Sequence, residues 1–202
     1  SGTLGGTLTG SIAAGSSSVT FSNVTYTKAQ SGVAVTAALT SGTSLENGTS
    51  AAFTVVAGAA NKLVFSVPPA DTVSTALINT AGGVKVEVRD ASDNLLTTDT
   101  RTVTLAIGTK PGNGVLSGTK TVAAVGGVAT FTTLNINEAG AGYTLVASST
   151  PALVTATSAP FSIFVGSAAQ LAISSVHGGS NPIAGTPFNI VVEAHDAGGN
   201  VV

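Results

Sequence analysis

Carboxylate and amide side chains gather in one short turn of the chain and return near its end. Calcium takes six to eight oxygen ligands of this kind, so the turn is the best candidate for a metal site. Asp and Asn also suit turns for a simpler reason, because they tolerate turn geometry and hydrogen-bond to the local backbone. The spacing is not that of an EF-hand, and Gly199 stands where the first copy has Asp93. We therefore favour the turn interpretation, keep calcium as an alternative, and assign no metal ligands. The residues concerned are Asp90, Asp93, Asn94, Asp99, Asp196 and Asn200.

The chain has two histidines, His177 and His195, as candidates for acid–base chemistry. His195 replaces Arg89 on the outward face of an expected strand, so we predict a solvated side chain. A catalytic triad needs a serine beside a positioned histidine and carboxylate, and serines are too plentiful here to single one out. We predict that the protein is not an enzyme, and we assign no catalytic or cofactor-binding residue and no cofactor.

Charge is scarce along the whole chain. Charged residues make up 8% of the 202 residues and the net charge is −2. Nucleic-acid binding needs a basic patch that neutralises phosphates, and seven scattered Lys and Arg do not form one. A weakly charged surface also opposes self-association only weakly. We therefore exclude nucleic acid as a partner and expect self-association or continuation of the same chain.

The apolar segments are short and are interrupted by Thr, Ser or Gly, so no membrane-spanning helix is expected. The chain begins with Ser rather than Met and shows no signal-peptide pattern, which indicates a processed chain or part of a longer one. Cysteine is absent. A domain of about 100 residues can bury enough core to fold without disulfides, so this absence is compatible with an extracellular location.

The chain repeats itself with a period of a little over 100 residues. Phe131 corresponds to Phe21, 110 residues earlier, and Leu171 corresponds to Leu63, 108 residues earlier. The segment VKVEVRDASDN at 84–94 returns as IVVEAHDAGGN at 190–200, 106 residues later. Self-similarity at a fixed period indicates an array of structural units.

Short segments rich in Val, Thr, Ile and Phe indicate an all-β protein. In 84–90 apolar and charged residues alternate, which places Val84, Val86 and Val88 on one face. Gly, Asn, Asp and Pro cluster between the segments, and we predict turns at 92–94, 108–114 and 138–142. This pattern is typical of a β-sandwich. The predicted strands are 63–67, 83–90, 101–107, 127–134, 143–149 and 159–165.

The repeat divides the chain into one complete and two partial units. Residues 63–170 form a complete repeat, 1–62 match the later half of a repeat, and 171–202 match its first part. The counterpart of 97–113 is missing from both partial units. Either the polypeptide continues as a tandem array, or successive copies complete each other by adding strands. We favour continuation, because the missing strand needs a source.

The segment 84–94, followed by TVTLAIGT and then GVLSGTKTVAAVGGVATFTTLNINEAGAGYTLVASS, resembles the bacterial immunoglobulin-like repeats of large surface proteins, including invasin- and intimin-type adhesin stalks. The resemblance implies tandem immunoglobulin-like β-sandwiches, one complete at 63–170 and two partial. It also implies that Tyr143 occupies the place of a tyrosine corner, whose hydroxyl bonds back to nearby backbone. Its counterpart in the first half-unit is Val33. The core Trp and paired Cys of antibody domains are missing.

From these features we expect a structural repeat of an extracellular fibre, sheath, surface layer or adhesin stalk at the cell surface. A carbohydrate- or receptor-binding module is the alternative. That alternative requires aromatic side chains grouped on one face, and the chain has two Tyr, seven Phe and no Trp. Asn23-Val-Thr25 and Asn47-Gly-Thr49 fit the N-glycosylation pattern, whose use depends on the host.

Overall fold

The structure, a computed structural model, describes residues 2–202. It confirms the all-β fold: the described residues form strands and a single 3₁₀ turn, η1 (His177–Gly179), with no α-helix among them. Contacts divide the chain into two compact units. The first holds the chain up to Ala60 together with Arg89–Leu96, and the second holds Asn61–Val88 and Thr97–Val202. In residues 2–202 no helix is long and apolar enough to cross a membrane.

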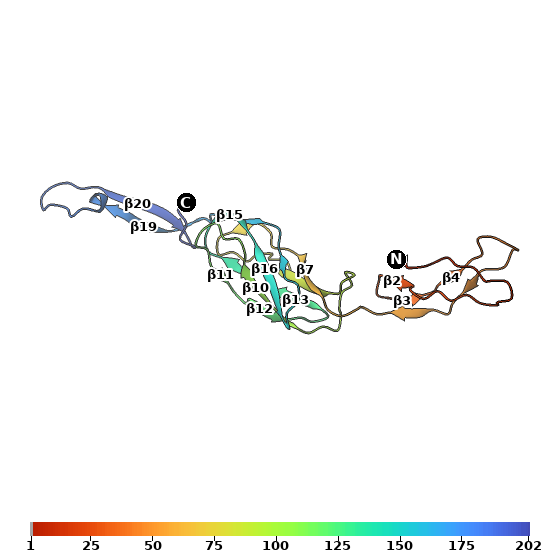
Figure 1. Cartoon of the computed structure of the whole chain (residues 1–202). Coiled ribbons are helices and arrows are strands. Elements are labelled where there is room, and N and C mark those ends of the chain that lie inside the picture. The colour runs from red at the N-terminus through yellow and green to blue at the C-terminus, as the bar shows by residue number, and fades with distance from the viewer. Residues whose placement is uncertain (1) are drawn as a thin grey trace. The chain divides into compact units, whose positions relative to one another are not determined.

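The second unit contains a β-sandwich built from two main sheets and two smaller ones (Figure 1). The first main sheet has the order β13 (Val128–Phe131), β9 (Val84–Arg89), β7 (Lys62–Val67). The second has the order β12 (Thr121–Ala123), β10 (Thr102–Ile107), β16 (Leu145–Thr150), β17 (Ala156–Thr157). The smaller sheets are β15 (Gly140–Tyr143), β18 (Phe161–Phe164), β8 (Thr72–Val73), and β11 (Leu116–Ser117) with β14 (Asn135–Ile136).

Alternation along the strands produces the core of this sandwich. In β9 the valines at 84, 86 and 88 are fully buried, and the charged residue that follows each of them is half-buried. The opposite sheet supplies Val103 and Leu105 from β10 and Leu145 from β16, all of them buried. Burial of one such side chain stabilises a fold by roughly 1.5–3 kcal/mol. The apolar alternation read in 84–90 is therefore the inner face of a sheet.

One predicted turn is wrong. Residues 138–142 were expected to turn, but β15 begins at Gly140 and pairs with β18. The register shifts between Ala141 and Tyr143, and Gly142 has a φ of 89°, in the left-handed region that favours glycine. The glycines therefore form a β-bulge within a strand, which is a second use of glycine besides the turn. Five of the six predicted strands are also longer than observed; the largest differences are at β13, which ends at Phe131, and at β18, which begins at Phe161.

The first unit consists of three two-stranded ladders. Among its described residues Val33 is the one hydrophobic side chain that is buried. The ladders pair β1 (Leu4–Gly5) with β2 (Thr25–Tyr26), β3 (Gln30–Val33) with β6 (Phe53–Val55), and β4 (Thr36–Ala37) with β5 (Gly48–Thr49).

Each ladder of the first unit reproduces a ladder of the sandwich. In β3–β6, Val33 lies opposite Phe53, as Tyr143 lies opposite Phe161 in β15–β18. Both ladders also shift register at the preceding residues. The pairing of β4 with β5 matches that of β16 with β17, and the pairing of β1 with β2 matches that of β11 with β14. The internal repeat seen in the sequence is therefore a repeat of backbone pairing.

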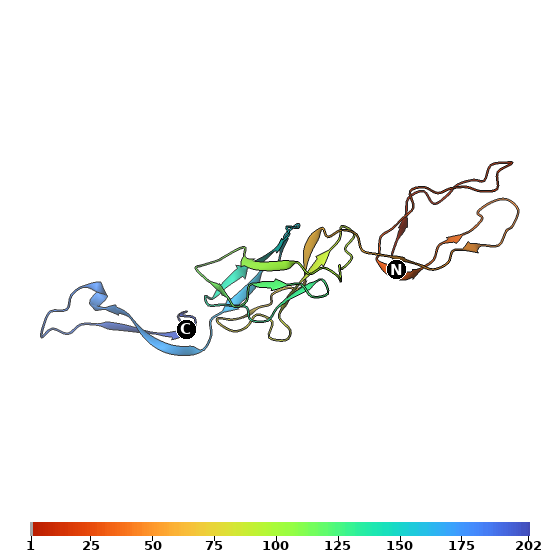
Figure 2. The ribbon, with the colours of Figure 1, turned by 90° about the horizontal axis from the view of Figure 1, so that it is seen from below.

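The end of the chain forms a long hairpin, β19 (Ala168–Val176) with β20 (Ile190–Asp196). These two strands pair with each other along their length, and His195 of β20 also forms a bridge with Val201; the hairpin can be followed in both views (Figure 2). In sequence β19 and β20 correspond to β7 and β9. Their burial differs sharply, because Leu171 is 77% exposed and its counterpart Leu63 only 3%.

Candidate junction sites at Asp90 and Asp196

Asp90 lies at the end of β9 and is buried in the first unit. Its Oδ1 accepts hydrogen bonds from the backbone N–H groups of Ser92 at 2.9 Å and Asn94 at 2.8 Å. Its Oδ2 accepts from the Asn94 side-chain amide at 2.9 Å and from the backbone N–H of Gly58 at 2.8 Å. The carboxylate thus closes its own turn and holds a backbone segment 32 residues away.

Asn94 extends the same network with both ends of its side chain. Its Oδ1 accepts from the backbone N–H of Ala29 at 2.8 Å, and its Nδ2 donates to the carbonyl of Thr27 at 3.0 Å. We call Asp90, Asn94, Thr27, Ala29 and Gly58 the first clamp. The first clamp joins the turn that follows β9 to two segments of residues 2–60.

The same network occurs again at Asp196, which is completely buried in the second unit. Asp196 accepts from its own turn through the N–H groups of Gly198 and Asn200, at 2.8 and 2.9 Å, and from the N–H of Gly166 at 2.8 Å. Asn200 accepts from the N–H of Ala139 at 2.8 Å and donates to the carbonyl of Asn137 at 3.0 Å. The second clamp comprises Asp196, Asn200, Asn137, Ala139 and Gly166.

Each member of the second clamp is the repeat counterpart of a member of the first. Asp196 and Asn200 follow Asp90 and Asn94 by 106 residues, and Gly166 follows Gly58 by 108. One addition distinguishes the second clamp: the buried Ser74 hydroxyl donates to Asp196 Oδ2 at 2.6 Å. Residues 1–62 match only the later half of a repeat, so the first clamp has no counterpart of Ser74.

The clamps hold their carboxylates in the charged state. Burial by itself raises the pKa of Asp90, but the hydrogen bonds from Asn94, Gly58 and Ser92 outweigh it and lower the pKa to about 2. For Asp196 burial again acts upward, and the donors Ser74, Gly166 and Asn200 lower the pKa further below its usual range. Charge-assisted hydrogen bonds of this kind are stronger than neutral ones.

The structure brings together only part of the predicted acidic group. The Asp90 and Asn94 side chains meet, whereas Asp93 is exposed and lies 3.9 Å from Arg89. Asp99 forms a two-point ion pair with Arg101, whose hydrogen bonds lower its pKa. Across residues 2–202 no three His, Cys, Asp or Glu side chains are placed to hold a metal ion.

The oxygens of the two clamp aspartates accept hydrogen bonds from N–H and O–H donors on every side that the contacts define, and these donors stabilise the charged carboxylates. Sequence reasoning found the turns but missed their distant partners at Gly58 and Gly166. Their repetition within AAFTVVAGAANKL and APFSIFVGSAAQL was the available signal.

The two histidines lie in different surroundings. His195 was expected to be solvated, yet its side chain is only 18% exposed. Its Nδ1 donates to the Gly199 carbonyl at 2.8 Å, and its Nε2 lies 3.4 Å from Glu193. His195 therefore supports its own turn. His177 is exposed and meets Phe188 edge-on at 6.4 Å.

Tyr143 makes the backbone bond that the resemblance implied. Its hydroxyl donates to the Glu138 carbonyl at 3.1 Å, and its ring lies 6.1 Å from that of Phe161. The side chain is fully buried, and burial raises the pKa of its hydroxyl. Tyr143 thus fixes the bulged strand β15 to the segment that precedes it.

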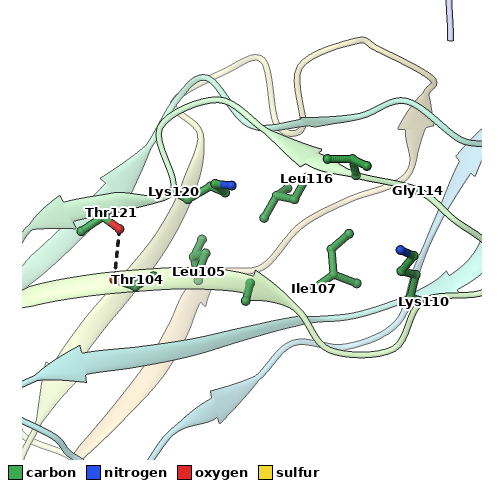
Figure 3. A pocket seen from close by; sticks show the side chains of 10 residues that line it. Thr104, Leu105, Ile107, Lys110, Gly114, Leu116, Lys120 and Thr121 are labelled. Carbon is green, nitrogen blue, oxygen red and sulfur yellow. Dashed lines mark hydrogen bonds between the residues drawn. The ribbon is translucent and has the colours of Figure 1, made fainter.

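The second unit also has an open depression of about 440 Å³ beside β10 (Figure 3). Leu105, Ile107 and Leu116 form its apolar floor, and Lys110 and Lys120 stand at its two ends. None of its lining residues is aromatic. The depression therefore lacks the aromatic platform expected of a carbohydrate site.

No family model matches this sequence, and no curated protein matches it either.

Proposed function

We propose that this chain is a structural segment of an extracellular array of immunoglobulin-like β-sandwiches, as in a fibre, sheath, surface layer or adhesin stalk of a bacterial cell surface. The observation that carries the proposal is the duplicated clamp. Two junctions, 106 residues apart at their aspartates, use the same residue types and the same backbone partners. Repetition of a junction is what an array of equivalent units requires.

The mechanism of such an array is mechanical. In each clamp the first turn of one repeat is hydrogen-bonded to two segments of the repeat before it. Hydrogen bonds to a charged group contribute about 1.5–3 kcal/mol each to stability. Several of them at every junction restrict bending and give the array a defined length per repeat.

Surface composition supports the same proposal. With 8% charged residues and a net charge of −2, neighbouring arrays repel each other weakly. The resemblance to bacterial immunoglobulin-like repeats points to a cell-surface location. The alternative binding module gains no support from the depression at Leu105, which lacks aromatic residues.

The test is to insert one, two or three further copies of residues 63–170 after residue 170. We expect the maximum dimension measured by small-angle X-ray scattering to increase by a constant step with each copy. Replacing Asp90 by Ala in every copy should reduce the increase in maximum dimension per copy and broaden the distribution of this dimension. The exposed Asp93→Ala control should leave both unchanged. An increase in maximum dimension that becomes smaller with each added copy would contradict the proposal. A globular monomer that binds immobilised glycans would contradict it as well.

A further inference from the structure

The turns of the two clamps read DASDN and DAGGN from their aspartates onward, so they differ at two places. Ser92 corresponds to Gly198, and Asp93 corresponds to Gly199. Asp93 and Gly199 both have a left-handed φ, 67° and 89°, so the two turns share their backbone conformation there. Gly198 has no such φ, and its backbone alone does not call for glycine. The difference between Ser92 and Gly198 therefore needs another explanation.

Other atoms occupy the space that a side chain on Gly198 would fill. A Cβ added there would collide with the carbonyl oxygen of Asn137 and would lie 3.0 Å from the hydroxyl oxygen of Ser74. The Asn137 carbonyl belongs to the backbone of a packed sandwich, so it cannot turn aside as a flexible side chain does. In the first clamp Ser92 is exposed, and that turn has room for a side chain at the same place.

The close approach at Gly198 coincides with a hydrogen bond to a buried side chain of the preceding repeat. The Ser74 hydroxyl donates to Asp196 Oδ2 at 2.6 Å, and the same oxygen accepts from the Gly166 N–H at 2.8 Å. A turn that carried a Cβ at residue 198 would have to lie further from the Asn137 carbonyl. The carboxylate would then be drawn away from Ser74 as well.

We propose that the residue two places after the clamp aspartate sets how closely the turn lies against the preceding repeat. Glycine, as at Gly198, lets the carboxylate reach a buried hydroxyl, whereas a side chain, as at Ser92, holds the turn further out. Gly198 is thus a positioning residue that acts through Asp196 and Ser74. The main-chain bonds of a clamp form in both cases, since the first clamp makes them with Ser92 in place. The inference rests on the proposed function, because it distinguishes two kinds of junction within one array.

A double-mutant cycle of Ser74→Ala and Gly198→Ala in the whole chain tests this coupling. With Gly198 present, Ser74→Ala should accelerate hydrogen exchange at the Gly166 N–H at least tenfold. The turn then opens more readily, because a hydrogen bond to a charged group has been removed. In the Gly198→Ala chain the hydroxyl is already out of reach, and Ser74→Ala should change the exchange rate less than twofold. Equal acceleration in both chains would overturn the inference.

Two further measurements separate a shifted turn from a detached one. In Gly198→Ala the Ala139 N–H, which donates to Asn200, should remain protected from exchange. Loss of that protection would mean that the turn has left its site, which contradicts the inference. Gly166→Ala is the matched control, because a Cβ there would lie at an ordinary 3.4 Å from Asp196 Oδ2. The tenfold effect of Ser74→Ala at residue 166 should persist in this control, and its disappearance would also contradict the inference.

The reverse substitution should create the close contact where it is missing. When a copy of residues 63–170 is inserted after residue 170, the Asp90 turn of the inserted copy meets the Ser74 of the first copy. Ser92 then stands in the place of Gly198. We expect Ser74→Ala in an isotope-labelled first copy to accelerate exchange at its Gly166 N–H tenfold only when the inserted copy carries Ser92→Gly.

The same acceleration with Ser92 and with Ser92→Gly, or none with either, would overturn the inference. The constant increase in maximum dimension with each inserted copy does not depend on this substitution. Failure of the inference is therefore distinguishable from failure of the proposed function.

Discussion

At the scale of single residues, the two clamps show how a chain with few charges uses its aspartates. Asp90 and Asp196 are buried without a cationic partner in their networks, and N–H and O–H donors replace water around them. A buried charge is expensive unless it is fully hydrogen-bonded, which explains why each carboxylate binds so many donors. The same expense makes the clamps sensitive to small changes.

Asp196→Asn should destabilise the second unit by about 2–4 kcal/mol, because an amide removes the charge and turns an NH₂ group toward donors. Urea denaturation and hydrogen exchange at the Gly166 N–H measure this loss. Asp93→Asn is the matched control, since Asp93 is 60% exposed and a surface pair contributes about 0–1 kcal/mol. Identical urea midpoints for the two variants would show that the clamp adds no stability.

Acid should weaken both junctions in a defined window. The pKa of Asp90 is lowered from 3.8 to about 2, so the folded state binds this proton more weakly than the unfolded state. The stabilisation is complete above about pH 4, declines as the pH falls toward about 2, and reaches its limit below that value. Stability curves against pH, with an NMR titration of the Asp90 carboxyl, test this. In Asp90→Asn the contribution from this residue should vanish, and an unchanged acid response would contradict the assignment.

At the scale of strands, residues at equivalent positions in two repeats contribute different amounts to folding stability. Leu63 in β7 and Leu171 in β19 occupy the same place in the repeat, but the first is buried and the second is exposed. The apolar residues of β19 and β20 thus alternate along the strands as core residues do, but they are exposed. Packing of the opposite sheet, rather than the residue type, decides the contribution of each leucine.

Leu63→Ala should cost about 2–5 kcal/mol of folding free energy, the usual range for a buried leucine. Leu171→Ala should change the stability of the isolated monomer by less than about 0.5 kcal/mol, as a surface change does. Denaturation at low protein concentration checks both values. A large effect of Leu171→Ala under these dilute conditions would mean that the hairpin is already covered within one chain.

Strands with long apolar alternation were predictable from the sequence, as β7, β9, β10 and β18 show. The two-residue ladders of the first unit were not, because β1 and β4 are too short to display a period. In the clamps, the local turn at Asp90 follows from known turn chemistry. Its bonds to Gly58 and Ala29 span 32 and 65 residues, and local patterns carry no information at that range.

At the scale of the whole molecule, the repeat leaves one strand unaccounted for. The counterpart of 97–113 is absent from both partial repeats, and in the complete repeat this segment contains β10 with its buried Val103 and Leu105.

The clamps also bear on how such a protein changes over generations. Apart from Ser74, each clamp holds the preceding repeat through main-chain atoms alone: an N–H of Gly and of Ala, and one carbonyl. Main-chain atoms are the same for almost every residue type, so neighbouring repeats can diverge in sequence and still fit. Recombination that duplicates or deletes a whole repeat would create a boundary with all its bonds already satisfied, and the gene could alter the length of its product in single steps.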